Sequence, residues 1–117
     1  MVELRIMSRQ WIVDEHGNII MGEGRKAILE NIDKTGSINQ TAKIMKMSYK
    51  GVWGKIKATE KYLNDDIVHA DRKTGTRLSK TGRELLRKYT ALKDQCTNED
   101  NRCFEIVFGK DCGQEGE

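Results

Sequence analysis

The chain has 117 residues, of which 37% are hydrophobic and 33% charged, so it is long enough for one domain with a modest core and has an ordinary soluble composition. It contains neither an apolar run of the roughly 20 residues that a membrane span requires nor an N-terminal signal peptide, which predicts a cytoplasmic protein. The net charge of +3 is uneven, because residues 1–93 carry 19 basic and 11 acidic side chains whereas residues 94–117 carry two and seven. We therefore expect a basic domain, residues 1–95, and an acidic tail, residues 96–117.

The first expected element is a β-hairpin. Residues 4–13 are rich in β-branched and aromatic residues, residues 14–18 carry turn-forming Asp, Gly and Asn, and residues 19–21 are apolar again. Trp11, within the first strand, is expected in the core, because tryptophan is highly buried on average. Residues 22–25 then open a helix whose apolar face is Ile28, Leu29 and Ile32.

Residues 35–63 predict a helix-turn-helix motif. Ser37 is an N-cap residue and Gln40 completes a capping box, so a short helix begins here. Ser48 caps a second helix after a turn of three to four residues, and this spacing is typical of the motif. The inward positions are Ile38, Ala42 and Met45 in the first helix and Val52, Ile56 and Thr59 in the second. Between residues 34 and 59 the chain carries six lysines and no acidic residue, which suits a polyphosphate partner.

Two short strands around a basic turn are expected after this motif. Residues 67–70 form the first strand, residues 72–77 carry the basic turn, and the chain returns through Leu78. Strands in this position, directly after a recognition helix, predict a wing. Ser79 then caps a final helix that we expect to end at Lys93.

The final helix is the predicted dimer interface, together with the first helix. Its apolar side is Leu85, Leu86, Tyr89 and Leu92. With Cys96, three of these residues form a stripe that exposes more apolar surface than a monomer of this size needs. A two-fold dimer doubles the contacts that one helix-turn-helix makes with palindromic DNA. We therefore predict a homodimer.

Several motifs occur here in a recognisable order: Met21–Arg25, Thr35–Ile38, Met47–Lys50 followed by Trp53, and Leu78–Leu86. Over roughly residues 5–95 the chain thereby resembles the N-terminal DNA-binding domain of the ModE-type molybdate-dependent transcriptional regulators, which is related to the LysR-type winged helix. The resemblance implies an α+β, mainly helical fold: a winged helix-turn-helix with an N-terminal β-hairpin and a C-terminal dimerisation helix. It also implies a dimer that binds an operator in the major groove.

Two departures from this family limit what the resemblance implies. The family usually has a long glycine-rich wing tip, but here the tip is only residues 73–76. A shorter wing is therefore expected, and the family's minor-groove or backbone contacts from the wing are not carried over. ModE-type regulators bind molybdate or tungstate in separate C-terminal domains, and about two dozen residues after the winged helix are too few for another domain. We therefore do not expect oxyanion sensing from this chain.

Recognition requires side chains that reach base edges from the second helix of the motif, and cations that hold phosphates. Lys50 can donate to guanine acceptors, and Tyr49 can contact a phosphate or a thymine methyl group. Trp53 lies near the DNA face or wedges against the first helix of the motif, and both alternatives stay open. The candidate DNA-binding residues are Ser37, Gln40, Ser48, Tyr49, Lys50, Trp53, Lys57, Arg72, Lys73 and Arg77.

Two glycines interrupt the second helix of the motif. Gly51 and Gly54 each cost about 1 kcal/mol relative to alanine in a helix interior. Either their missing side chains let the helix approach the groove more closely, or they relieve crowding beneath Trp53. The sequence does not choose between these two explanations.

The function expected from these features is that of a sequence-specific, homodimeric DNA-binding transcriptional regulator with its recognition helix in the major groove of double-stranded DNA. The alternative is a winged helix that serves as a protein-interaction module without specific DNA binding. A steep loss of DNA affinity with salt, and discrimination between operator and random DNA, favour the first. No enzyme is expected, because no paired-carboxylate, Cys/His or Ser/His constellation is visible.

Three cysteines lie in the last 22 residues: Cys96, Cys103 and Cys112. Their wide spacing differs from the close pairs of common zinc sites, and an odd number argues against a disulfide framework. They are either incidental thiols in a disordered polar tail or ligands of a metal or iron–sulfur cluster that senses a signal. Residues 104–108 can also form one strand.

Overall fold

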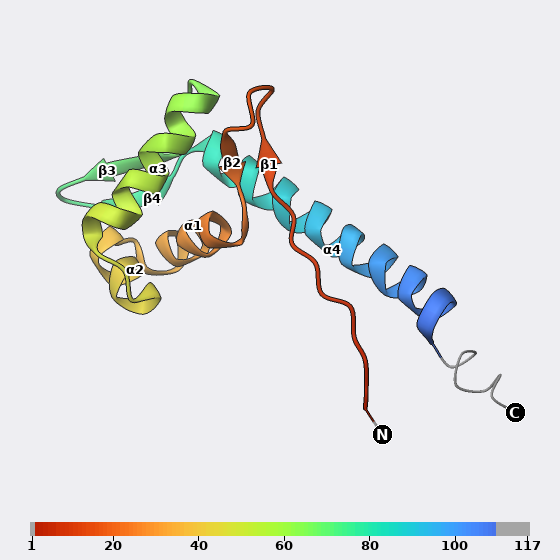
Figure 1. Cartoon of the computed structure of the whole chain (residues 1–117). Helices are drawn as coiled ribbons and strands as arrows, with labels where there is room; N and C mark the ends of the chain where they lie inside the picture. The colour runs from red at the N-terminus through yellow and green to blue at the C-terminus, as the bar shows by residue number, and fades with distance from the viewer. Residues whose placement is uncertain (1, 110–117) are drawn as a thin grey trace, which may run out of the picture.

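The computed structural model describes residues 2–109, which form two small hairpins and four helices. The elements in chain order are β1 (Ile12–Val13), β2 (Ile19–Met21), α1 (Glu23–Thr35), α2 (Ile38–Met45), α3 (Tyr49–Leu63), β3 (Val68–Asp71), β4 (Gly75–Leu78) and α4 (Lys80–Phe108). The hairpins, α1, α2 and α3 gather at one end, whereas α4 projects away from them (Figure 1). The molecule is accordingly elongated, with principal extents of 67 × 31 × 20 Å.

The three serines predicted as N-cap residues precede α2, α3 and α4. The Ser37 hydroxyl accepts a hydrogen bond from the Gln40 N–H at 3.0 Å, and the Ser48 hydroxyl accepts one from the Gly51 N–H at 2.9 Å. Ser79 caps α4 in the same way. These bonds satisfy backbone donors that a helix N-terminus leaves without an intrahelical partner. The helix-turn-helix is therefore confirmed, with residues 46–48 as the turn between α2 and α3.

The N-terminal hairpin is shorter than predicted. Its first strand is only Ile12–Val13, which pairs antiparallel with Ile19–Met21, and residues 2–11 have no strand partner. Trp11 was expected in the core, and this expectation is wrong, because 59% of its surface is exposed. Its position directly before a two-residue strand leaves it beside the start of α1 and outside the core.

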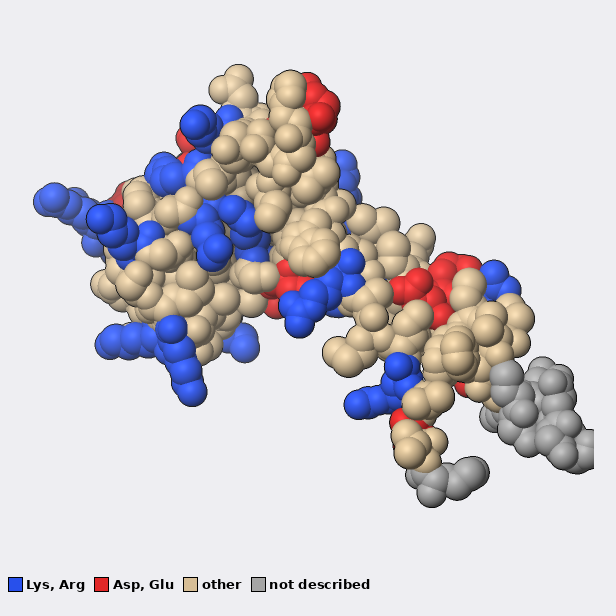
Figure 2. Space-filling view, in the orientation of Figure 1, with Lys and Arg blue, Asp and Glu red and all other residues tan. Residues whose placement is uncertain are grey.

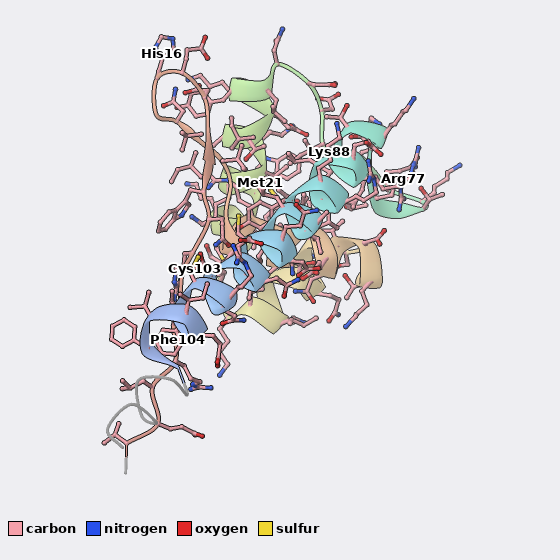
Figure 3. All side chains as sticks on the ribbon, turned by 90° about the vertical axis from the view of Figure 1, so that its right-hand side faces the viewer. His16, Met21, Arg77, Lys88, Cys103 and Phe104 are labelled. Atoms are coloured by element: carbon pink, nitrogen blue, oxygen red, sulfur yellow. The ribbon has the colours of Figure 1, made fainter. Side chains whose placement is uncertain are left out.

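The core lies between α1, α2, α3 and the two hairpins. The predicted inward residues of α1 and α3 are buried, and Met21 of β2 is completely buried among them (Figure 3). Thr59 of α3 donates a buried hydrogen bond of 2.9 Å to the Ile20 carbonyl, which joins α3 to the N-terminal hairpin. This bond satisfies a hydroxyl group that would be costly to bury unpaired.

The final helix does not end at Lys93 as predicted but continues to Phe108. No Gly or Pro occurs between residues 83 and 108, and Gly109 follows the last helical residue, so nothing in this stretch breaks the helix. The predicted strand at residues 104–108 is wrong for the same reason. The expected boundary between domain and tail, at residues 95–96, falls inside α4.

The N-terminal segment, residues 2–11, lies beside the distal half of α4. The Ser8 hydroxyl donates to the Asp100 carboxylate, and the Tyr89 hydroxyl of α4 donates to the Gln10 carbonyl at 2.7 Å. Glu23 of α1 accepts from Tyr89 at 3.1 Å and pairs with Lys93 at 2.8 Å. This network ties the segment, α1 and α4 together. No helix within residues 2–109 is long and apolar enough to cross a membrane.

Candidate nucleic-acid interface

The outward ridge of α3 consists of Lys50, Gly54, Lys57 and Lys61, all of them exposed. These positions recur at helical spacing on the side opposite the buried face of α3. The buried face is fixed by the core, so the orientation of this ridge is fixed as well. The sequence predicted Lys50 and Lys57 as DNA contacts, and the structure brings both to this ridge.

Trp53 lies at the edge of the ridge, between the exposed and the buried faces of α3. It is half-buried and packs against the core, which agrees with a wedge. Its ring also stacks with Tyr49, with 6.5 Å between ring centroids, and the Lys57 ammonium lies 4.5 Å from the Trp53 ring centroid. Trp53 therefore supports the side chains of Tyr49 and Lys57, while Tyr49 is half-exposed toward solvent.

Glu60 was missed at the sequence level, although it is the first acidic residue after the lysine run. Its carboxylate forms an ion pair with Lys57 at 2.9 Å. It also accepts hydrogen bonds from the N–H groups of Ile67 and Val68 at 2.8 and 3.3 Å. Burial by itself raises the pKa of Glu60, but the hydrogen bonds from Lys57, Ile67 and Val68 outweigh it and lower the pKa. Glu60 therefore remains charged, holds the base of the wing on α3 and offsets the charge of Lys57.

The two glycines of α3 differ in their surroundings. Apart from the adjoining residues Trp53 and Lys55, a Cβ atom at Gly54 would meet nothing within 4 Å. A Cβ atom at Gly51 would lie 3.1 Å from the Ser48 hydroxyl and 3.5 Å from the Met47 side chain, and Trp53 is not among its near neighbours. Relief of crowding beneath Trp53 is thus wrong at Gly51. The close-approach explanation stays open at Gly54, which lies on the ridge.

The cap residues keep part of their hydrogen-bonding capacity. The Ser37 and Ser48 hydroxyl oxygens accept bonds from their own helices, which leaves each hydroxyl hydrogen free to donate. Gln40, in the first turn of α2, is exposed. Donors at a helix N-terminus suit a phosphate group. The proposed contacts of these three residues with DNA remain predictions.

The wing is also held against the helix-turn-helix near its tip. Gly75 of β4 has a positive φ of 87°, and a Cβ atom there would lie 2.6 Å from the carbonyl oxygen of Gly36, which directly follows α1. The Thr76 N–H donates to that carbonyl at 2.9 Å. Only glycine combines this backbone conformation with this close approach. The wing position relative to α3 is therefore fixed by two contacts, at Gly36 and at Glu60.

The three predicted wing cations are exposed: Arg72, Lys73 and Arg77. The Asp71 carboxylate stabilises the turn at the wing tip, because it accepts hydrogen bonds from the N–H groups of Lys73 and Thr74. These bonds lower the pKa of the Asp71 carboxyl group. Arg77 projects from β4 away from the body (Figure 3). The basic side chains of α2, α3 and the wing gather at one end of the molecule, while acidic ones are visible on the hairpin tip and along α4 (Figure 2).

The predicted metal ligands are not brought together within residues 2–109. Cys96 and Cys103 lie on α4 two turns apart, which separates them by about 10 Å along the helix. One ion therefore does not bind both thiols of the same chain. Cys112 lies outside the described residues, and among those described no group of three His, Cys, Asp or Glu side chains is placed to hold a metal ion.

Comparison with known proteins tests the fold and the resemblance. Over 97 residues, or 80% of the chain, the sequence is 29% identical to the molybdenum transport protein ModE of Azotobacter vinelandii. The predicted similarity to ModE is confirmed. The match takes in 36% of that protein, so the chain spans about a third of the length of this relative. No model of a known protein family matches the sequence.

Two solved structures share the arrangement of the elements. The crystal structure of CbnR, a LysR family transcriptional regulator, matches with a TM-score of 0.59, and that of full-length CbnR complexed with its target DNA matches with a TM-score of 0.60. Each match is 15% identical and covers 73% of this chain and 29% of CbnR. At this identity the likeness shows the fold alone. The fold is a mainly helical α+β winged helix-turn-helix, as predicted.

Proposed function

We propose that the protein is a sequence-specific DNA-binding transcription regulator that acts as a homodimer and places α3 in the major groove. The observation that carries this proposal is the run of six lysines between residues 34 and 59, all of them exposed and none accompanied by an acidic residue in that run. The run coincides with the helix-turn-helix. A protein of the same fold, CbnR, has been crystallised with its target DNA.

The roles of individual residues follow from their positions. Lys50, near the start of α3, reaches base edges and donates to guanine. Tyr49 contacts a phosphate or a thymine methyl group from the same turn of α3. Arg72, Lys73 and Arg77 contact phosphates from the wing and contribute affinity without sequence preference.

The direct test is selection of bound duplexes from a random pool, followed by binding to the selected operator at several salt concentrations. We expect affinity to fall steeply with salt and to exceed that for unrelated DNA. Lys50→Ala should weaken operator binding and relax specificity at one base position. Arg77→Ala should weaken binding to all sequences and reduce the salt slope, which is the steepness of log affinity plotted against log salt concentration, by about 1. Lys88→Ala on α4 is the matched control. Binding without salt dependence or sequence preference would favour a protein-interaction module.

The homodimer rests on α1 and α4, although the predicted stripe needs correction. Tyr89 is buried in the core and unavailable to a partner, whereas Leu92 is 41% exposed. An open hollow of about 850 Å³ lies between α1 and α4, and its apolar lining includes Leu86 and Ala91. This hollow is large enough to receive side chains of a second helix.

The charges of α4 favour an antiparallel pair. Residues 80–93 carry five basic residues and one acidic one, whereas residues 94–108 carry one basic and four acidic ones. An antiparallel arrangement places the basic half of one α4 against the acidic half of the other, whereas a parallel arrangement places like charges together. The homodimer therefore has a defined orientation.

Light scattering at micromolar concentration tests the homodimer. We expect a dimer mass for the wild type and a monomer mass for Ala91→Asp, which puts a charge into the hollow between α1 and α4. Arg77 lies on the wing and does not line this hollow, so Arg77→Ala should remain dimeric. A monomeric wild-type protein would contradict the proposed assembly.

A further inference from the structure

Trp11 is an exposed aromatic side chain that the fold holds in place. A Cβ atom at Gly22 would lie 2.9 Å from Cδ1 and 3.2 Å from Nε1 of Trp11, so the five-membered part of the indole lies directly against the backbone at Gly22. Because Ile12 pairs with Met21 across the hairpin, the residues next to this pair, Trp11 and Gly22, are brought side by side. The indole is thereby fixed on one side and open to solvent on the other.

Two cations border the same surface. Arg25 of α1 and Lys55 of α3 line a small hollow of about 190 Å³ together with Trp11 and Gly22. The Arg25 Nε donates to the Lys55 carbonyl at 3.5 Å, which holds the guanidinium group against α3. Partial burial lowers the pKa of Arg25, but an arginine remains charged at neutral pH. None of the side chains of Trp11, Arg25 and Lys55 is among the DNA contacts predicted from the sequence.

The charge of this surface is not cancelled by its one acidic neighbour. Glu23 also borders the hollow, but its carboxylate is paired with Lys93 at 2.8 Å and accepts from Tyr89 at 3.1 Å. Within residues 2–109, neither Arg25 nor Lys55 forms an ion pair with a carboxylate. Two cations beside an aromatic ring therefore remain available to an anionic partner.

This surface lies on the side of α3 opposite the wing. Glu60 joins α3 to the base of the wing, whereas Thr59 and Lys55 face the N-terminal hairpin and α1. Figure 1 shows α3 between the wing on one side and the β1–β2 hairpin on the other. A helix in the major groove, which is about 12 Å wide, meets a phosphate strand on each side. The wing supplies cations for one strand only.

We propose that Trp11, Arg25 and Lys55 bind the sugar-phosphate backbone of the DNA strand that borders the major groove on the side of α3 away from the wing. Arg25 and Lys55 pair with phosphate oxygens, and the exposed part of the Trp11 indole packs on a deoxyribose. This contact rests on the proposed DNA-binding function and adds a second backbone clamp to it. Backbone contacts of this kind set the orientation of the protein on the duplex and carry no sequence information.

The test compares Lys55→Ala, Arg25→Ala and Trp11→Ala with the matched control Lys88→Ala. Binding is measured to the selected operator and to an unrelated duplex over a range of salt concentrations. Removal of either cation should weaken binding to both duplexes by a similar factor, about tenfold, and reduce the salt slope by about 1. Trp11→Ala should weaken binding to both duplexes without changing the slope, because the indole carries no charge.

Phosphate ethylation interference locates the contact. In the wild-type complex, ethylation should interfere at phosphates on both sides of the α3 contact, and Lys55→Ala should lose interference on the side away from the wing. Lys55 is exposed, so this variant should fold, and Arg25→Gln removes the charge while keeping a long polar side chain if Arg25→Ala is unstable. If the wild type binds its operator and Lys55→Ala and the folded Arg25 variants bind like Lys88→Ala, the proposed clamp is wrong. If the wild type binds no DNA, the proposed function itself is wrong and the clamp with it.

Discussion

The two ends of the molecule differ in how far their apolar side chains are buried and in the charge of their exposed side chains. At the end formed by α1, α2, α3 and the hairpins, apolar residues are buried in one core and the exposed side chains are largely cationic. Along the distal half of α4, large apolar side chains such as Ile106 and Phe108 remain 64% and 57% exposed. On the adjoining N-terminal segment, Leu4 and Met7 are exposed as well.

This difference agrees with the two proposed roles, DNA binding at the first end and self-association along α4. At the first end the apolar side chains are already buried in the core. The exposed side chains there can therefore be cationic and suit contact with a polyanion. The distal half of α4 and its adjoining segment have an open apolar surface, which is typical of a region that another protein surface covers. The junction between the two ends is the network of Gln10, Glu23, Tyr89 and Lys93. Changes at the junction should therefore affect stability, and changes at the first end should affect DNA binding.

The largest effect is expected at Gly82, where α4 meets the body. A Cβ atom at this position would lie 2.1 Å from the Ile67 carbonyl oxygen, which is backbone and does not move easily. Gly82→Ala should lower the free energy of unfolding by roughly 3 kcal/mol, at the upper end for overpacking. Urea unfolding measures this loss. Gly24→Ala is the control, because a Cβ atom at Gly24 meets nothing within 4 Å. The stability of this variant should be unchanged or higher. Equal stability of the two variants would contradict the close packing at Gly82.

The next effect concerns the junction itself. Tyr89→Phe removes the hydrogen bonds to Gln10 and Glu23 and should lower the free energy of unfolding by about 1–2 kcal/mol. The N-terminal segment should also separate from α4 more often, so trypsin should cleave after Arg9 faster than in the wild type. Tyr62→Phe, at an exposed tyrosine of α3, is the control. An unchanged cleavage rate in Tyr89→Phe would show that the segment is held by other contacts.

A smaller effect with opposite signs is expected at Gly54. Gly54→Ala should raise the free energy of unfolding by about 1 kcal/mol, because alanine is the better helix former and the site is open. The same methyl group lies on the outward ridge of α3 and should weaken operator binding by about tenfold if the backbone there approaches DNA closely. Asn98→Ala on α4 controls for a change of helix propensity alone. A stabilised variant with wild-type affinity would show that Gly54 is not a close-contact position.

The smallest effect is a pH dependence at Glu23. Its pKa is lowered chiefly by the hydrogen bond from Lys93 and further by that from Tyr89, against the opposing effect of burial. Because the pKa is lower in the folded state than in the unfolded state, Glu23 stabilises the fold above the unfolded value of about 4.5, and this contribution disappears as the pH falls through the folded pKa. The stability difference between the wild type and Glu23→Gln should therefore be largest near neutral pH and shrink on acidification. A difference that is constant with pH would exclude this linkage.

The sequence by itself determined the features that depend on near neighbours in the chain. The three serine caps, the buried faces of α1 and α3 and the wing all lie where local patterns predict them. These features are local because a cap bonds to a backbone group three residues away and because a buried face repeats every three or four residues. The run of six lysines between residues 34 and 59 could also be identified from the sequence, because it depends only on the order of the residues.

The extent of α4 was misjudged at the sequence level for a different reason. After Lys93 the composition becomes polar and acidic, and the apolar periodicity that marks a packed helix fades. The absence of Gly and Pro up to Phe108 was the available signal. A helix that projects from the body does not require the apolar face by which amphipathic helices are identified.

Only the tertiary structure decided which distant residues meet. Trp11 lies outside the core because the hairpin places it on Gly22, and Tyr89 is buried because Gln10 and Glu23 reach its hydroxyl group. The pairing of Arg25 with the backbone of Lys55 joins residues 30 positions apart. Such contacts depend on how α1, α3 and α4 cross, and this crossing is set by the packing of the whole core rather than by any local pattern.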